Sequence, residues 1–220
     1  PNKDSLAECN KRQNINRDLV ASVKKIQNHG LQVQGGFILG FDSDPVSVFK
    51  SQINLVQKSG IVVAMVGLLN APRGTKLYQR LKKEDRLLEN VSGDNTDCSM
   101  NFVPKMDRET LINGYRQVLT TIYSPKQYYM RVKTFLKQYK PQKRRGISHL
   151  QFWHIWAFIR SVWFLGITDR GRWPYWRFFV STLLRRPRSF PISMTFAIHG
   201  FHFRTVVRKY IGVPVEDASA

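Results

Sequence analysis

The chain has 220 residues, of which 42% are hydrophobic and 12% aromatic, and its formal net charge is +20. This length and apolar content support a folded core and exclude a wholly disordered chain. The chain has two cysteines, Cys9 and Cys98, which excludes a disulfide framework and favours a reducing, cytoplasmic compartment.

The first part of the chain alternates helical and strand patterns with short connections. The predicted order is helix, strand, helix, strand, helix, at residues 17–28, 31–39, 45–59, 61–69 and from 75 onward. Asp44 is expected to be the N-cap of the second helix, with Pro45 as its first residue. The run IVVAMVGLL predicts a strand covered on both faces. The pattern indicates βα units with parallel strands, in a barrel or in an open doubly wound sheet.

The second part of the chain is different in character. Residues 92–101 are polar and rich in turn formers, and they predict a boundary. Beyond it the strand signal disappears, and helices are predicted at about 107–123, 125–139, 148–165, 174–186 and 194–211. The fold class is therefore α/β, with parallel strands in residues 1–92 and a mostly α-helical region in residues 101–220.

The stretch QVQGGFILGFDSDP, residues 32–45, indicates a ligand loop. Ligands meet the carboxyl ends of parallel strands, and glycines such as Gly36 and Gly40 allow a ligand to approach the backbone. Ile38 offers an apolar surface that suits a flat ring. The alternative is that the glycines serve only packing and a turn, and their spacing is not that of a dinucleotide fingerprint.

Three segments, CNKRQNINRD, GGFILGFDSDP and VGLLNAPRGTKLY, occur in this order, one in each βα unit. Together they resemble the later half of the radical S-adenosylmethionine (SAM) enzyme barrel, most closely its cobalamin-binding class. The resemblance covers about residues 1–90. It implies a partial (half) TIM-type barrel followed by a helical extension.

The resemblance also implies roles for individual residues. Lys11 and Arg12 would meet the SAM carboxylate. The predicted strand at residues 31–39 would line the adenine and ribose, and the backbone of the strand at residues 61–69 would hydrogen-bond adenine. The chain departs from the family where Asp42 and Ser43 replace a proline–glycine turn. The alternative interpretation of Lys11 and Arg12 is a solvent-exposed charged face. The alternative for Ile38 and Val66 is a purely structural place in the core. The expected cofactor-binding residues are Lys11, Arg12, Gly36, Ile38, Gly40, Val66 and Leu68.

Radical SAM chemistry requires a C-x₃-C-x₂-C motif that holds a 4Fe–4S cluster, and this chain does not contain it. We therefore expect a fragment whose N-terminal part carries the cluster and a cobalamin domain, the alternative being a natural cluster-less descendant. The intact protein is expected to be an iron–sulfur oxidoreductase or transferase that cleaves SAM, and cobalamin-dependent methyl transfer or rearrangement is left open. This chain alone is expected to be inactive, with no catalytic or metal-binding residue assigned to it.

Residues 101–220 carry 21 basic and 5 acidic residues, and most of the aromatic ones. Segments such as RWPYWRFFVSTLLRRPRSF leave three interpretations open. The first is a helical cap on the barrel with an aromatic core. The second, which is also the alternative function for the whole chain, is a module that docks on an anionic membrane surface or on a partner. Nucleic-acid binding is the least favoured, because no recognised motif is present.

Overall fold

Helices dominate the computed structural model, which describes residues 3–88, 99–140 and 152–211. The elements are α1 Lys3–Glu8, η1 Arg12–Asn14, α2 Leu19–Asn28, β1 Gln34–Leu39, α3 Val48–Ser59, β2 Val63–Leu68, α4 Lys76–Lys83, α5 Arg108–Tyr123, α6 Pro125–Gln138, α7 Phe152–Trp163, the π-helical turn η2 Phe164–Thr168, α8 Arg172–Arg185, η3 Pro187–Ser189 and α9 Phe190–Ile211. The class is mixed α/β, as the sequence predicts.

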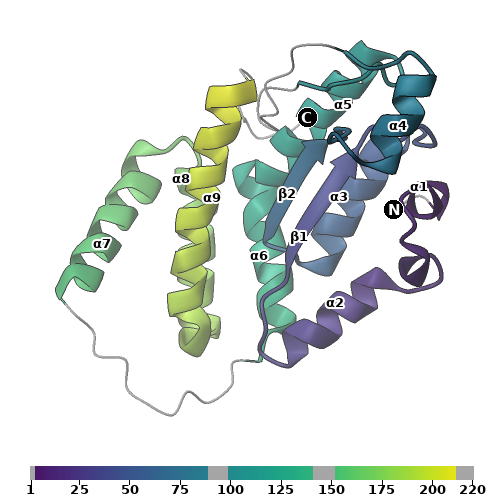
Figure 1. Cartoon of the computed structure of the whole chain (residues 1–220). Helices are drawn as coiled ribbons and strands as arrows, with labels where there is room; N and C mark the ends of the chain where they lie inside the picture. Colours follow the sequence, from purple (N-terminus) through teal and green to yellow (C-terminus); the bar gives the residue numbers. More distant parts are fainter. Residues whose placement is uncertain (1–2, 89–98, 141–151, 212–220) are drawn as a thin grey trace.

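The two strands β1 and β2 pair in parallel, from Gln34 opposite Val63 to Leu39 opposite Leu68. They are joined by α3, which packs behind β1 (Figure 1). The prediction of two parallel strands in βα units is confirmed, although β1 begins at Gln34 rather than at residue 31. The described residues form two strands, so the half TIM-type barrel stays a prediction.

One face of this sheet is buried and the other is open within the described part of the chain. Leu39 and Ala64 are fully buried in the core together with Val56 of α3. On the opposite face the side chains of Ile38 and Met65 are 45% and 57% exposed. The expectation that β2 is covered on both faces is therefore wrong for the residues described. Successive side chains of a strand alternate between its faces, and only one face meets helices here.

The outer edge of β2 is closed by side chains of α5 and α6 in place of a third strand. Its carbonyl groups and their donors are Val62 with Arg131 Nη2 at 3.2 Å, Ala64 with Tyr123 Oη at 2.7 Å, and Val66 with Tyr115 Oη at 3.4 Å. The donors recur every eight residues, and the acceptors every two. An unpaired strand edge is a template for unwanted pairing, and these donors block it.

Arg131 is fully buried and joins three elements. Besides the carbonyl of Val62, it donates to the carbonyl of Ile122 at 2.6 Å, one of the last carbonyls of α5. Its guanidinium lies 5.5 Å and 5.1 Å from the ring centres of Tyr123 and Tyr128. Burial lowers the pKa of Arg131. The charge is therefore held by carbonyl dipoles and aromatic rings rather than by a carboxylate.

One hydrophobic core runs from the sheet through α5 and α6 to α8 and α9. Tyr128 of α6 donates to the carbonyl of Phe196 in α9 at 2.7 Å. A buried ion pair between Arg204 and Asp169, at 2.5 Å, joins α9 to the end of η2. The predicted division into residues 1–92 and 101–220 stays a prediction. No helix in the described ranges is long and apolar enough to cross a bilayer.

Candidate functional site

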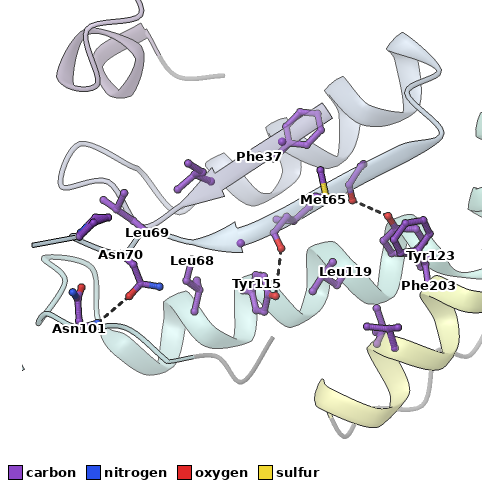
Figure 2. Close-up of a pocket in the computed structure, with 18 of the residues that line it drawn as sticks. Phe37, Met65, Leu68, Leu69, Asn70, Asn101, Tyr115, Leu119, Tyr123 and Phe203 are labelled. Carbon is purple, nitrogen blue, oxygen red and sulfur yellow. Dashed lines mark hydrogen bonds between the residues drawn. The ribbon is translucent and has the colours of Figure 1, made fainter. Parts of the chain in front are cut away.

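A cavity of about 910 Å³ lies on the open face of the sheet and extends over the edge of β2 toward α5 and α9. Figure 2 shows Phe37 and Met65 over the strands, Tyr115, Leu119 and Tyr123 along α5, and Phe203 on α9. Most of the lining is apolar. Lys11 is the charged residue among the described side chains that line it, and Asn70 and Asn101 add amide groups.

The register of the strands places two glycine-containing pairs on the open face. Gly36 lies opposite Met65, and Ile38 lies opposite Gly67. A Cβ added to Gly36 would meet no atom within 4 Å, whereas one added to Gly35 would lie 2.7 Å from the Phe37 ring. The missing side chain of Gly36 therefore leaves open space in the cavity, next to the apolar surface of Ile38. This arrangement suits the face of a flat ring.

The structure brings five of the seven predicted cofactor-binding residues to this one cavity: Lys11, Gly36, Ile38, Val66 and Leu68. Their role in binding stays a prediction. Arg12 begins η1, and its side chain lies outside the described part of the chain.

Gly40 does not line the cavity and has a conformational role. Its φ of +102° is one that residues with a side chain rarely adopt, and an added Cβ would lie 3.1 Å from Leu111 Cδ2. Its N–H donates to Asp44. Gly40 therefore ends β1 and starts the loop, with no space beside it for a ligand.

Asp44 organises the loop after β1. Its carboxylate accepts hydrogen bonds from the N–H groups of Gly40 and Phe41, at 3.0 Å and 3.1 Å, and from Ser5 Oγ at 2.5 Å. The prediction that Asp44 caps the following helix is wrong, because α3 begins only at Val48. The carboxylate instead fixes the end of β1 against α1.

A second carboxylate, Asp42, ties the same loop to α4. Arg86 binds it with both terminal nitrogens, at 2.7 Å and 3.0 Å, and Arg80 approaches it at 3.1 Å. Arg80 also pairs with Glu8 of α1 at 3.0 Å. The hydrogen bond from Arg86 holds the pKa of Asp42 below its ordinary value despite its burial. These ion pairs position the loop at the carboxyl end of β1.

Asn70 and Asn101 close the loop after β2. Asn101 donates its side-chain N–H to the carbonyl of Ala71 at 2.7 Å and accepts from the N–H of Ala71 at 2.8 Å. Asn70 Oδ1 accepts from the backbone N–H of Asn101 at 3.1 Å (Figure 2). Sequence reasoning missed both residues, because Asn101 falls in the stretch interpreted as a boundary.

The aromatic and aliphatic wall from α5 and α9 was also missed. Tyr115, Tyr123 and Phe203 line the cavity on the side of β2. The rings of Tyr123 and Phe203 stack at 5.0 Å, and burial raises the pKa of Tyr123, so its hydroxyl stays protonated. Nothing in the sequence places α5 or α9 beside β2 apart from the eight-residue recurrence of Tyr115, Tyr123 and Arg131.

The residues of this chain do not fit a 4Fe–4S cluster. Such a cluster in the expected family needs three cysteine thiolates, and the chain has two cysteines. Cys9 is partly exposed and unbonded to another cysteine, and Cys98 lies outside the described residues. Among the residues described, no three His, Cys, Asp or Glu side chains come together as a metal site.

Comparison with known proteins shows a match to one family model and similarity to proteins named as methyltransferases or methylases. A family model described as "Domain of unknown function (DUF4070)" matches residues 75–212. The chain is 30% identical over 222 residues to an uncharacterized methyltransferase of Synechocystis sp., a match that covers 99% of this chain and 41% of that protein.

Two further relatives have more specific names. The chain is 24% identical over 191 residues to a hopanoid C-2 methylase of Rhodopseudomonas palustris, covering 84% of this chain and 35% of that protein. It is 29% identical over 122 residues to a bacteriochlorophyllide d C-12(1)-methyltransferase of Chlorobaculum tepidum, covering 56% and 26%. The chain thus spans less than half the length of these curated relatives. No solved structure matches it.

Proposed function

Because the chain belongs to the DUF4070 family and is similar to curated methyltransferases, we propose that it is the C-terminal part of a radical SAM methyltransferase. In this proposal residues 1–92 supply part of the SAM pocket, as half of a TIM-type barrel. The observation that carries the proposal is the cavity on the open face of two parallel strands. Five of the residues expected to bind SAM line it.

The cavity fits the chemistry of SAM. Gly36 leaves space for the plane of the adenine ring, and Ile38 provides apolar contact on the same face of the sheet. Lys11 is a cation at the cavity wall that suits the carboxylate of SAM. Gly40 is not assigned to the pocket. A 4Fe–4S cluster held by residues outside this chain would supply the electron for cleavage of SAM.

The cluster itself has to be held by residues outside these 220, since this chain has too few cysteines. Cobalamin is a proposal for the intact protein, and no residue of this chain is assigned to it. The role of this chain is to bind and orient SAM and to exclude water from the open face of the sheet. Alone it should neither hold a cluster nor turn over.

The methyl acceptor that the cavity favours is a large, mostly apolar molecule. The volume of about 910 Å³ is at the upper end of small-molecule sites, and apolar side chains such as Leu119, Phe203 and Val206 line it. Two of the curated relatives are named for a hopanoid and a bacteriochlorophyllide, which agrees with this class.

The test is SAM cleavage by the intact protein, reconstituted with iron and sulfide under anaerobic conditions. We expect Gly36→Leu to lower 5′-deoxyadenosine formation at least tenfold, because the new side chain would occupy the space beside Ile38. Met65→Leu, at the register partner of Gly36, is the matched control and should keep activity, since it conserves volume. Wild-type cleavage by a folded Gly36→Leu protein would refute the pocket assignment. A stoichiometric cluster on the 220-residue chain would refute its place as a cluster-less part.

A further inference from the structure

Two helices far from the cavity carry exposed apolar stripes. On α7, Trp156, Ile159 and Trp163 follow the spacing of one helix face, and their side chains are 57%, 61% and 57% exposed. Figure 1 shows α7 beside α9, on the side away from the sheet. We call these three residues, together with Arg160, the α7 stripe.

The α8 stripe consists of Trp173, Arg177, Val180 and Leu184, spaced at four, three and four residues along one face. Trp173 and Leu184 are the most exposed large hydrophobic residues described, at 76% and 75%. The inner faces of the two helices meet through Phe158 of α7 and Phe179 of α8, whose rings stack at 6.3 Å. The stripes therefore lie on the outer faces of the two helices, where no described element covers them.

The charge around the stripes has one sign. Residues 152–211 contain ten Lys and Arg and a single acidic residue, Asp169. The side chain of Asp169 is 2% exposed and pairs with the buried Arg204, so it places no negative charge on the surface. The exposed surface of this region thus combines tryptophan, aliphatic residues and arginine.

A groove of about 750 Å³ lies between α6 and α8 along the α8 stripe. Its lining includes Trp173, Trp176 and Val180, and Lys126, Lys133 and Arg177 add positive charge without an acidic residue among the described lining. Desolvation lowers the pKa of Lys133, and the nearby Arg177 and Arg185 lower it further. A phosphate placed there would relieve this repulsion between cations.

We propose that the α7 and α8 stripes dock on an anionic lipid bilayer, with the groove receiving lipid headgroup phosphates. Tryptophan and leucine side chains would enter the interface between headgroups and acyl chains, and the arginines would stay with the phosphates. Both helices would lie along the surface, since no described helix is long and apolar enough to cross it. This docking does not depend on the chemistry of the cavity.

The test is flotation of the 220-residue chain with vesicles of phosphatidylcholine, with and without phosphatidylglycerol. We expect binding to the anionic vesicles at about 0.1 M salt, and weaker binding near 1 M salt, where charges are screened. Tryptophan emission should shift to shorter wavelength on binding, because the exposed indoles leave water. Absence of binding to anionic vesicles at low salt would overturn the proposal.

A chain with a net charge of +20 can bind anionic vesicles without a specific surface, so matched variants decide the matter. The double variant Arg177→Glu, Arg185→Glu should weaken binding at least about 25-fold, because each basic residue near the membrane surface contributes about fivefold to the affinity. Lys50→Glu with Lys58→Glu makes the same charge change eight residues apart on the exposed face of α3. This control should retain most of the binding.

An uncharged pair of variants tests the apolar contribution. Trp173→Ala with Leu184→Ala should reduce the emission shift, leaving the part that comes from Trp156 and Trp163, and should weaken binding, whereas Leu31→Ala with Val46→Ala, at other exposed apolar positions, should do neither. Equal effects of stripe and control variants would show that net charge alone drives binding, and would overturn the proposal. Loss of vesicle binding when the remainder of the intact protein is present would mean that another segment covers the stripes, and would overturn it as well.

Discussion

Tyr123→Phe is the sharpest test of how the edge of β2 is closed. The substitution removes only the hydroxyl that donates to the carbonyl of Ala64 at 2.7 Å, and it keeps the ring against Phe203. Tyr123 is 2% exposed and Ala64 is fully buried, so water cannot replace the donor. A buried carbonyl left without its partner costs about 1–3 kcal/mol, and we expect a loss of about 2 kcal/mol in the free energy of unfolding.

Urea unfolding followed by circular dichroism measures this loss. With a slope of about 2 kcal/mol per molar urea, the midpoint should fall by about 1 M. Tyr175→Phe is the control, because Tyr175 is equally buried but, within the described part of the chain, its hydroxyl has as acceptor only the sulfur of Met194 at 4.0 Å. Losses of the same size in both variants, or a loss below about 0.5 kcal/mol for Tyr123→Phe, would refute the proposed role of the hydroxyl.

Three further substitutions test other parts of the structure. Gly60→Ala should lower the unfolding free energy by about 3 kcal/mol, because φ is +69° and the new Cβ would lie 2.9 Å from the backbone nitrogen of Phe135; an unchanged urea midpoint would contradict the close approach. Arg131→Met should cost about 2–3 kcal/mol in the same assay, because it leaves buried carbonyls without a charged donor; a neutral effect would contradict that role. The pKa of Asp42 is lowered by folding, so its stabilisation is complete above the unfolded pKa of about 4 and is lost as pH falls through the folded value. Asp42→Asn should therefore remove part of the acid sensitivity of the melting temperature, and identical pH profiles would contradict the ion pair with Arg86.

Local signals predicted much of the fold correctly. Asp107 and Thr75, residue types that favour the N-cap position, accept hydrogen bonds from the N–H groups of Thr110 and Tyr78 at the predicted helix starts. Gly60 ends α3 with a left-handed conformation. These features depend on residues within a few positions of one another, so a single sequence contains the information.

Features that depend on distant partners were not predictable in this way. Asp44 has the sequence signature of an N-cap, but Ser5, 39 residues away, and the amides of Gly40 and Phe41 bind its carboxylate instead. Helix boundaries after residue 150 also shifted, since α9 begins at Phe190 rather than at residue 194. Packing of the aromatic residues, not local spacing, decides where these helices begin.

The candidate site was predictable where it depends on the strands themselves. Gly36 and Ile38 lie two residues apart on one face of β1, so the motif on that strand is enough to bring them together. Asn101 and Phe203 come from later segments that only the tertiary structure places at the cavity. A strand sequence thus predicts its own face but not what lies beside its edge.

The distance along the chain between β2 and its edge donors sets an order of events during synthesis. Val62 and its donor Arg131 are separated by 69 residues. At about 5–20 residues per second, translation takes roughly 3–14 s to bring the guanidinium out after the strand. During this interval the β2 edge of the nascent sheet is unprotected, and chaperones or neighbouring chains can reach it. The emergence of α6 from the ribosome therefore marks the moment at which the β2 edge of the nascent sheet gains the last of its three donors.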